Sequence, residues 1–152
     1  MNTRTATSNE THSHHLGNAA IDGLIAGAAG GLVMVAYLLV AMAILGEAPA
    51  TLLSRFASGD MQGSIMTGVV GHLAVSSIYG MVFVLIGRLL LRGQHKSVRV
   101  LGGVVYGVLL FTFAEFVLLP AFQSPMLGIP IVHFGIAHVI YGLVLGFLIK
   151  LR

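Results

Sequence analysis

Residues 133–149 read H-F-G-I-A-H-V-I-Y-G-L-V-L-G-F-L-I, and this stretch decides the fold class. It is apolar and long enough to cross a bilayer, because a helix rises about 1.5 Å per residue through a hydrocarbon layer of about 30 Å. Two histidines nevertheless stand at its leading end. Its centre, I-Y-G at residues 140–142, repeats residues 78–80 of an earlier apolar segment that also carries a histidine, His72. The stretch therefore predicts membrane helices with polar groups near one face of the bilayer.

The composition of the 152-residue chain agrees with this interpretation. It is 57% apolar and only 9% charged, with a mean hydropathy of +0.96, whereas about a quarter of the residues of soluble domains are charged. Too little polar surface is left to coat a soluble particle, so lipid must cover the outside. The net charge of +3 comes from clustered basic residues and indicates membrane topology rather than nucleic-acid binding. The absence of cysteine excludes disulfides and thiolate sites.

Four apolar runs alternate with polar or proline-containing connections. Only helices and closed barrels satisfy backbone hydrogen bonds in lipid, and these runs lack the alternation of barrel strands. The sequence therefore predicts an all-α, integral membrane four-helix bundle. A short surface helix is expected after Pro49, because Leu52, Leu53 and Phe56 share one helical face. The expected spans are residues 23–45, 64–91, 100–119 and 131–149, within one transmembrane domain that covers residues 21–152.

Residues 1–20 are polar, lack periodicity and contain no apolar core of a secretory signal peptide. They are predicted to form a disordered tail. Its histidines His12, His14 and His15 are of a type that binds zinc, copper or nickel. A solvated tail is the simpler interpretation, because a coil loses entropy when it closes around a metal.

Basic residues predict the orientation of the spans. The connection between the second and third spans, with its flanks, carries Arg88, Arg92, Lys96 and Arg99 without an acidic residue. Since positive charge stays on the cytoplasmic side, both termini are expected in the cytoplasm of a cell with a bacterial-type inner membrane.

The two halves of the chain resemble each other. The I-Y-G matches extend by one further valine, and the glycine spacing of the first span recurs in the third. Two tandem hairpins inserted in the same orientation would explain this pattern, and chance similarity between low-complexity segments is the alternative. Small residues four positions apart let helix backbones approach closely, either within the bundle or in a groove for a partner helix. These residues are Gly23, Gly27, Gly31, Gly103, Gly107, Gly142 and Gly146.

Ionisable side chains gather at one expected depth. From the rise of a helix, His72, Glu115 and His138 should lie roughly 7 to 12 Å below the outer boundary of the bilayer. Such groups are costly in lipid, and they usually face the interior of a bundle or mark a site. Further polar side chains near this layer are His133, closer to the surface, and Tyr79 and Tyr141, which lie deeper.

Three interpretations of this layer stay open. In the first, the histidines and Glu115 only hydrogen-bond neighbouring helices, and no cofactor is bound. In the second, His72 and His138 hold a b-type haem or a quinone, with room for the ring beside Gly71. In the third, Glu115 and the histidines form a proton, solute or metal transport site.

Signatures of the common enzyme classes are missing. The sequence has no phosphate-binding glycine loop, no H-E-x-x-H motif and no serine nucleophile elbow. We therefore expect a non-enzymatic protein, foremost an accessory, stabilising or assembly subunit of a larger respiratory or photosynthetic membrane complex. Its expected partners are the lipid bilayer and other membrane subunits or further copies of the chain.

Two patterns resemble a known group of proteins. G-H-L-x(5)-Y-G begins at Gly71, and H-x(4)-H-x-x-Y-G-L-V-L-G begins at His133. They resemble a poorly characterised group of small bacterial four-helix inner-membrane proteins, in which a Gly-His pair opens an even-numbered helix and a Tyr-Gly step follows. The resemblance covers most of residues 23–149 and implies the same topology without implying an activity. The chain departs from it at Glu115, where the resemblance implies an apolar or aromatic residue.

Overall fold

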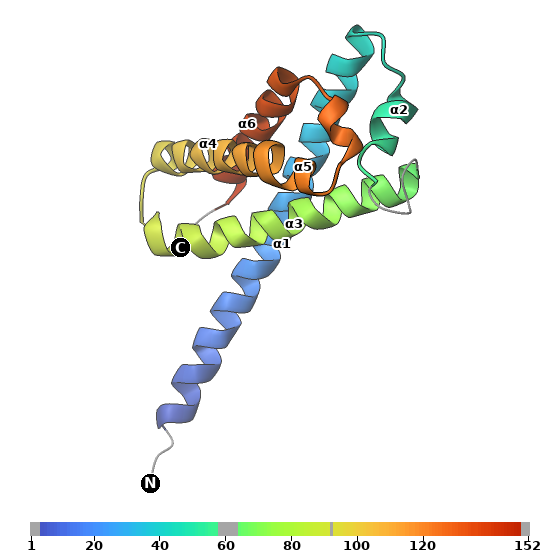
Figure 1. Cartoon of the computed structure of the whole chain (residues 1–152). Coiled ribbons are helices and arrows are strands. Elements are labelled where there is room, and N and C mark those ends of the chain that lie inside the picture. The colour runs from blue at the N-terminus through green and yellow to red at the C-terminus, as the bar shows by residue number, and fades with distance from the viewer. Residues whose placement is uncertain (1–3, 58–63, 92, 150–152) are drawn as a thin grey trace.

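The computed structural model describes residues 4–57, 64–91 and 93–149, with side chains from Gly17 onward. Every secondary-structure element in these ranges is helical (Figure 1). The elements are α1 (Arg4–Ile44), α2 (Pro49–Ser54), α3 (Ile65–Leu90), α4 (Lys96–Phe113), the π-helical turn η2 (Ala114–Leu118), α5 (Leu119–Ala121), the 3₁₀ turn η3 (Pro125–Gly128) and α6 (Ile131–Leu148).

The prediction of an all-α bundle with four membrane-spanning helices is confirmed. In the described residues, four helical segments are long and apolar enough to cross a membrane, with mean hydropathies between 2.0 and 2.3. Their large apolar side chains point outward along most of their length, as expected of helices that are covered by lipid. The four segments are Gly17–Ile44, Ile65–Leu90, Lys96–Ala121 and Ile131–Leu148.

The first helix is longer than the sequence predicts. Its backbone is helical from Arg4, whereas a disordered tail is expected up to residue 20, and Figure 1 shows α1 extending well beyond the other helices. A helix that has already formed adds turns without a new nucleation step, so a polar segment can continue it. The side chains of residues 1–16 lie outside the described part, so metal binding by the tail histidines stays a prediction.

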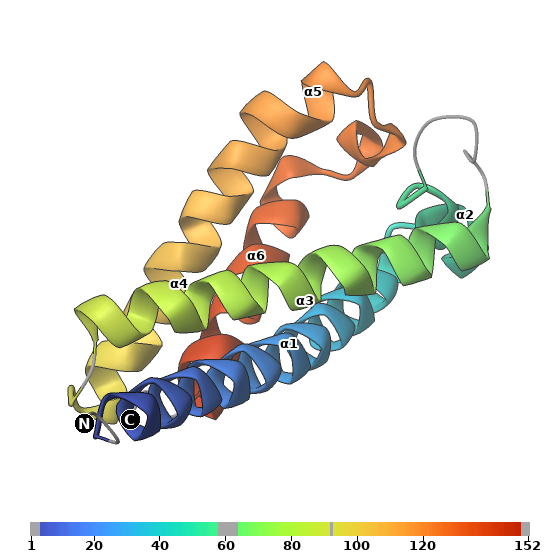
Figure 2. The same cartoon turned by 90° about the horizontal axis from the view of Figure 1, so that it is seen from below.

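The spans form two antiparallel hairpins. α1 packs along α3, α4 packs along α6, and the two hairpins meet where α1 contacts α6. α3 and α4 are joined by the short turn around residue 93, and Figure 2 shows them diverging from this turn toward α5. The bundle is therefore closed between α1 and α6 and splayed between α3 and α4.

Glycines set the closest approach within each hairpin. A Cβ atom added to Gly27 would lie 3.0 Å from the Cα atom of Gly80, and one added to Gly107 would lie 3.3 Å from the Cα atom of Gly142. The backbones can approach this closely only without side chains, as in small-residue membrane interfaces. The other glycines highlighted by the sequence lie at similar helix contacts inside the bundle, namely Gly23, Gly31, Gly103 and Gly146.

The helix of the third span changes from α-helical to π-helical geometry near its end. The sequence predicts a third span over residues 100–119, and the helix continues past Pro120 through the π-helical turn η2 into α5. Proline has no N–H group, and its ring clashes with the carbonyl four residues earlier. The wider turn accommodates this, because the N–H of Leu119 donates to the carbonyl of Ala114, five residues back.

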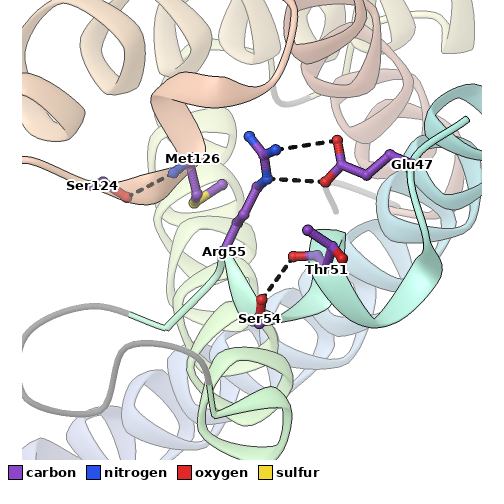
Figure 3. A network of polar contacts seen from close by, with 6 residues as sticks. All are labelled: Glu47, Thr51, Ser54, Arg55, Ser124 and Met126. Atoms are coloured by element: carbon purple, nitrogen blue, oxygen red, sulfur yellow. Dashed lines mark hydrogen bonds and ion pairs between the residues drawn. The ribbon is translucent and has the colours of Figure 1, made fainter. Parts of the chain in front are cut away.

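The connection that carries α2 is fixed against the loop that precedes α6. In Figure 3 the guanidinium of Arg55 points at Glu47, with Nε 2.9 Å from Oε1 and Nη2 donating to Oε2 at 3.3 Å. The same guanidinium lies against Gly128 of η3, where any side chain would collide with it. Leu52 of the predicted surface helix is completely buried. Both loops are thus held together over one end of the bundle, called the α2–η3 end below.

Candidate functional site

A cavity of about 360 Å³ lies among the four spans, in the half of the bundle nearest the α2–η3 end. Met34 of α1, Leu110 of α4 and a number of other apolar side chains form most of its wall. Pockets that bind small molecules typically measure about 300–1,000 Å³ and are mostly apolar with a few polar groups. The polar side chains along this wall are Thr67, His72, Ser76, Tyr79, His138 and Tyr141.

The cavity is least enclosed between α3 and α4, because these two helices make few contacts with each other. Two rows of residues, each spaced four apart along its helix, line the two sides of this region, called the lateral opening below. The row on α3 is exposed, and the row on α4 and η2 is half-buried. At the α2–η3 end the cavity is covered by Phe56, which follows α2, and by Met126 of η3. The rows are Thr67, Gly71 and Val75 on α3, and Leu110, Ala114 and Leu118 opposite.

His72 is fixed on the α3 wall. Its Nε2 atom lies 3.3 Å from the carbonyl oxygen of Gly31 and 3.5 Å from Oγ of Ser76. A carbonyl can only accept, so Nε2 carries the proton and Nδ1 is left as an acceptor in the neutral ring. The ring also stacks on Phe56, with centroids 4.7 Å apart. Nδ1 has no hydrogen-bond partner among the described residues.

His138 faces it from α6. Its Nδ1 atom donates to the carbonyl of Phe134 at 2.9 Å, and the ring of Phe134 lies against it at 4.5 Å between centroids. The neutral ring therefore presents Nε2 as an acceptor, and within the described part of the chain this atom has no partner. A histidine oriented by a backbone carbonyl is held in one tautomer and one direction.

Two tyrosine hydroxyls form hydrogen bonds between the two hairpins. The hydroxyl of Tyr141 on α6 donates to the carbonyl of Ser76 at 2.6 Å, and the hydroxyl of Tyr106 on α4 donates to the carbonyl of Tyr79 at 2.8 Å. Both bonds end on α3, and both lie on the side of the cavity away from the α2–η3 end. Tyr79 and Tyr141 are themselves part of the cavity wall.

The structure brings together four of the six polar residues that the sequence places in one layer. His72, Tyr79, His138 and Tyr141 line the same cavity. The two others, His133 and Glu115, do not.

His133 instead lies between α6 and α1, where its Nδ1 atom is 2.9 Å from the hydroxyl of Tyr37. Glu115 is half-buried on η2 and is not part of the cavity wall. The reason is rotation: Ala114 lines the cavity, and the next residue of a helix points in another direction around the helix axis.

Sequence reasoning missed Ser76, Tyr106 and Phe56. Ser76 is one helical turn from His72, and a polar residue at that spacing in an apolar span was a usable signal. Tyr106 was detectable as a third intramembrane tyrosine. Phe56 was expected on the surface helix, but nothing in the sequence indicates that it lies over His72.

The arrangement of the two histidines bears on whether the cavity could hold a metal ion or a haem. Among the residues that the structure describes, no group of three or more His, Cys, Asp or Glu side chains could hold a metal. His138 is oriented as haem-ligating histidines are, with Nδ1 on a backbone carbonyl. His72, however, directs its Nε2 atom to Gly31, so the cavity is not arranged for two Nε2 ligands to one iron.

Comparisons with known proteins give one match. A family model described as a family of unknown function (DUF6789) matches residues 17–151, which include the four spans and the cavity. Comparison with curated proteins and with solved structures gives no significant match.

Proposed function

Since the chain belongs to the DUF6789 family, whose description names no activity, we propose a function from the cavity: this multi-pass membrane protein is a non-enzymatic binding protein for a lipid-soluble small molecule. The ligand occupies the space among the four spans, with its polar head between His72 and His138 and its apolar part along the remaining wall.

The single observation that carries this proposal is the pairing of the two histidines across an apolar cavity of about 360 Å³. Structural histidines in membrane bundles bridge helices, as His133 does with Tyr37. His72 also bridges two helices, because one of its ring nitrogens is bonded to the carbonyl of Gly31 on α1, whereas His138 is bonded to the carbonyl of Phe134 within its own helix. Their other nitrogens have no partner within the described residues, and a ligand would supply it. Acceptors in a mostly apolar cavity favour a ligand with a matching polar head.

The structure gives less support to the other interpretations of the polar layer. A b-type haem would need His72 to release Gly31 and turn its Nε2 atom. A transport site that uses Glu115 together with the histidines would need Glu115 to rotate toward the cavity. A quinone-type molecule in its hydroxyl-bearing form needs neither change, and it is the form of the cofactor interpretation that we retain.

An accessory role in a larger membrane complex is compatible with ligand binding. The glycine faces that the sequence offered to a partner helix are, however, used inside the two hairpins, as at Gly27 and Gly107. A partner would therefore contact the outward apolar faces. Copurification of another subunit after gentle extraction would support this role, and a protein that always migrates alone would count against it.

The test compares two histidines of the same helix. His138→Leu removes an acceptor from the cavity, whereas His133→Leu removes a histidine outside it. The protein is purified in lipid nanodiscs, bound small molecules are extracted and identified by mass spectrometry, and the absorption spectrum is recorded. We expect one molecule retained by the wild type and by His133→Leu, and about tenfold less of it in His138→Leu, the effect of losing one buried hydrogen bond.

Other results would overturn the proposal. Equal retention by the two variants would place the ligand elsewhere. A preparation that retains nothing and binds no added lipid-soluble quinol would leave the cavity without a binding role. A Soret band lost in His138→Leu would replace the quinone-type ligand with haem.

A further inference from the structure

We infer that the ligand enters sideways from the bilayer through the lateral opening between α3 and α4, and that it is a neutral lipid whose head donates hydroxyl hydrogens while its apolar tail occupies the opening. This inference rests on the proposed function and specifies the route and the chemistry of the ligand. Quinols with long apolar tails are the class that fits.

The route follows from comparing the two places where the hairpins face each other. The glycine contact Gly27–Gly80 of the first hairpin corresponds to Gly107–Gly142 of the second. In this alignment α1 is equivalent to α4, and α3 is equivalent to α6. The α1–α6 interface and the α3–α4 opening are therefore equivalent positions of two similar hairpins. One of them is closed and the other is not.

The α1–α6 interface is closed by a glycine and a hydrogen bond. Gly30 lets the ring of Tyr141 pack against α1, since an added Cβ atom would come within 2.9 Å of that ring. One turn or more nearer the α2–η3 end, the hydroxyl of Tyr37 meets His133 at 2.9 Å. A small residue and a polar bridge thus bring these two helices together.

The equivalent residues at the lateral opening cannot do this. When Gly27 is aligned with Gly107, Gly30 corresponds to Leu110. A branched side chain therefore stands where α4 would need a glycine opposite Tyr79. The same alignment also places Tyr37 on Val117, and the alignment of Tyr79 with Tyr141 places Gly71 on His133. The polar bridge is therefore replaced by a valine and a glycine, and a Cβ atom added at Gly71 would meet nothing within 4 Å.

The opening faces lipid rather than water. It lies in the membrane-spanning parts of α3 and α4, and its exposed row includes Val75, with 48% of its surface accessible. The α2–η3 end, which would give access from water, is covered by Phe56 and Met126. A molecule dissolved in the bilayer therefore reaches the cavity by the shortest path, and a long apolar tail can stay in the opening.

The hydrogen bonds of the histidines define the head of the ligand. Nε2 of His72 and Nδ1 of His138 donate to backbone carbonyls, which leaves one acceptor nitrogen on each neutral ring. Two acceptors require two donors, so a head with two hydroxyl groups satisfies both, whereas a head with only carbonyl groups satisfies neither. This distinguishes a quinol from its quinone.

The first experiment locates the tail. A quinol with a photoactivatable group in its alkyl tail is incorporated with the full-length protein into nanodiscs and irradiated. Cross-links are mapped by mass spectrometry. We expect them on residues 67–75 and 110–118. Cross-links confined to α1 or α6 would overturn the lateral route while the proposed binding function stands.

The second experiment closes the opening. Gly71→Leu adds a side chain where there is free space, so the fold should tolerate it; Gly17→Leu, also in free space at the far end of the bundle, is the matched control. We expect quinol affinity at least about tenfold lower in Gly71→Leu and unchanged in Gly17→Leu. Wild-type affinity in Gly71→Leu would overturn the route. A wild type that binds no quinol would instead refute the proposed function itself.

A third comparison tests the head. Binding of the quinol and of the corresponding quinone is measured at about pH 8, where ordinary imidazole is neutral. We expect tighter binding of the quinol, by about tenfold, because only its hydroxyls can donate to the two acceptor nitrogens. Equal binding, or tighter binding of the quinone, would overturn the assignment of a hydroxyl-donating head.

Discussion

The two hairpins of this protein share a backbone contact but differ in the side chains beside it. In both, glycines of two helices touch at the crossing, Gly27 with Gly80 and Gly107 with Gly142. Four residues before the second glycine of each pair, α3 carries Ser76 and α6 carries His138. The crossing fixes how close the helices are, and the neighbouring positions are free to carry different chemistry.

The aligned positions one helical turn earlier, on α3 and α6, also carry different side chains. The residue of α6 that aligns with His72 is Phe134, which supplies the carbonyl and the ring that orient His138. On α3 the imidazole itself occupies this position and is oriented by Gly31 of the facing helix. Each hairpin thus contributes one histidine, but from positions that are one helical turn apart when the two hairpins are aligned. Similar hairpins can therefore build an asymmetric cavity without changing how each is folded.

The largest loss of stability is expected when a side chain is added at the glycine crossings. Gly27→Val and Gly107→Val would each force backbones apart, because an added Cβ atom meets Ser77 Cα at 2.9 Å in one case and the carbonyl of His138 in the other. Inserting bulk into a packed interior costs about 1–3 kcal/mol, and we expect the upper end here, since backbone cannot move aside as a side chain can. Reversible unfolding in mixed detergent micelles measures the loss.

Gly71→Val is the matched control for these variants, with nothing within 4 Å of the added Cβ atom, and it should unfold like the wild type apart from a small change in helix propensity. If the hairpins are equivalent, the two crossing variants lose similar stability. A large loss in one and none in the other would show that only one crossing holds the bundle together.

The second-largest loss of stability is expected at the closed α1–α6 interface. Gly30→Leu gives α1 the residue that α4 carries at Leu110, and its side chain would collide with the ring of Tyr141. We expect a loss of about 2 kcal/mol in unfolding free energy, within the range for overpacked sites. The displaced ring should also lose its bond to Ser76. Unfolding as stable as the wild type would mean that a glycine at residue 30 is not what closes this interface.

Much of the fold could be predicted from the sequence because lipid imposes simple rules. Backbone groups must be satisfied within each span, so apolar runs of sufficient length become helices, and the four spans follow. The extension of α1 to Arg4 and the π-helical turn before Pro120 could not be predicted. Both depend on whether a helix that has already formed continues through an unfavourable segment, and hydropathy does not report this.

The sequence points to residues of the candidate site but not to the direction of their side chains. Counting residues along a helix places His72, Glu115 and His138 at a similar level. Which way each points depends on rotation about the helix axis, and spans that are apolar on nearly every face carry no periodic signal of it. His72 and His138 face the cavity, whereas Glu115 does not, since Ala114 occupies the inward position on η2. Only packing between the hairpins decides this.

The hydrogen bond of the closed interface should have a smaller effect. Tyr37→Phe removes the hydroxyl that meets His133 at 2.9 Å. Hydrogen bonds between membrane helices contribute on average about 0.6 kcal/mol and at most about 1.7, and we expect about 1 kcal/mol because this bond lies in the closely packed α1–α6 interface. The measurement is again unfolding in mixed micelles. Val117→Thr, at the aligned position of the open side, is the control that should change little.

The smallest effect on stability is expected at the bond that crosses the open side. Tyr106→Phe removes the donor to the carbonyl of Tyr79 at 2.8 Å but keeps the ring packed on Phe83, 5.2 Å away between centroids. We expect a loss near the average of about 0.6 kcal/mol. Cysteine pairs introduced across α3 and α4, in a chain without native cysteine, should cross-link more slowly in this variant because the helices separate further. Cross-linking at the wild-type rate would show that packing on Phe83, rather than the hydroxyl, limits the width of the opening.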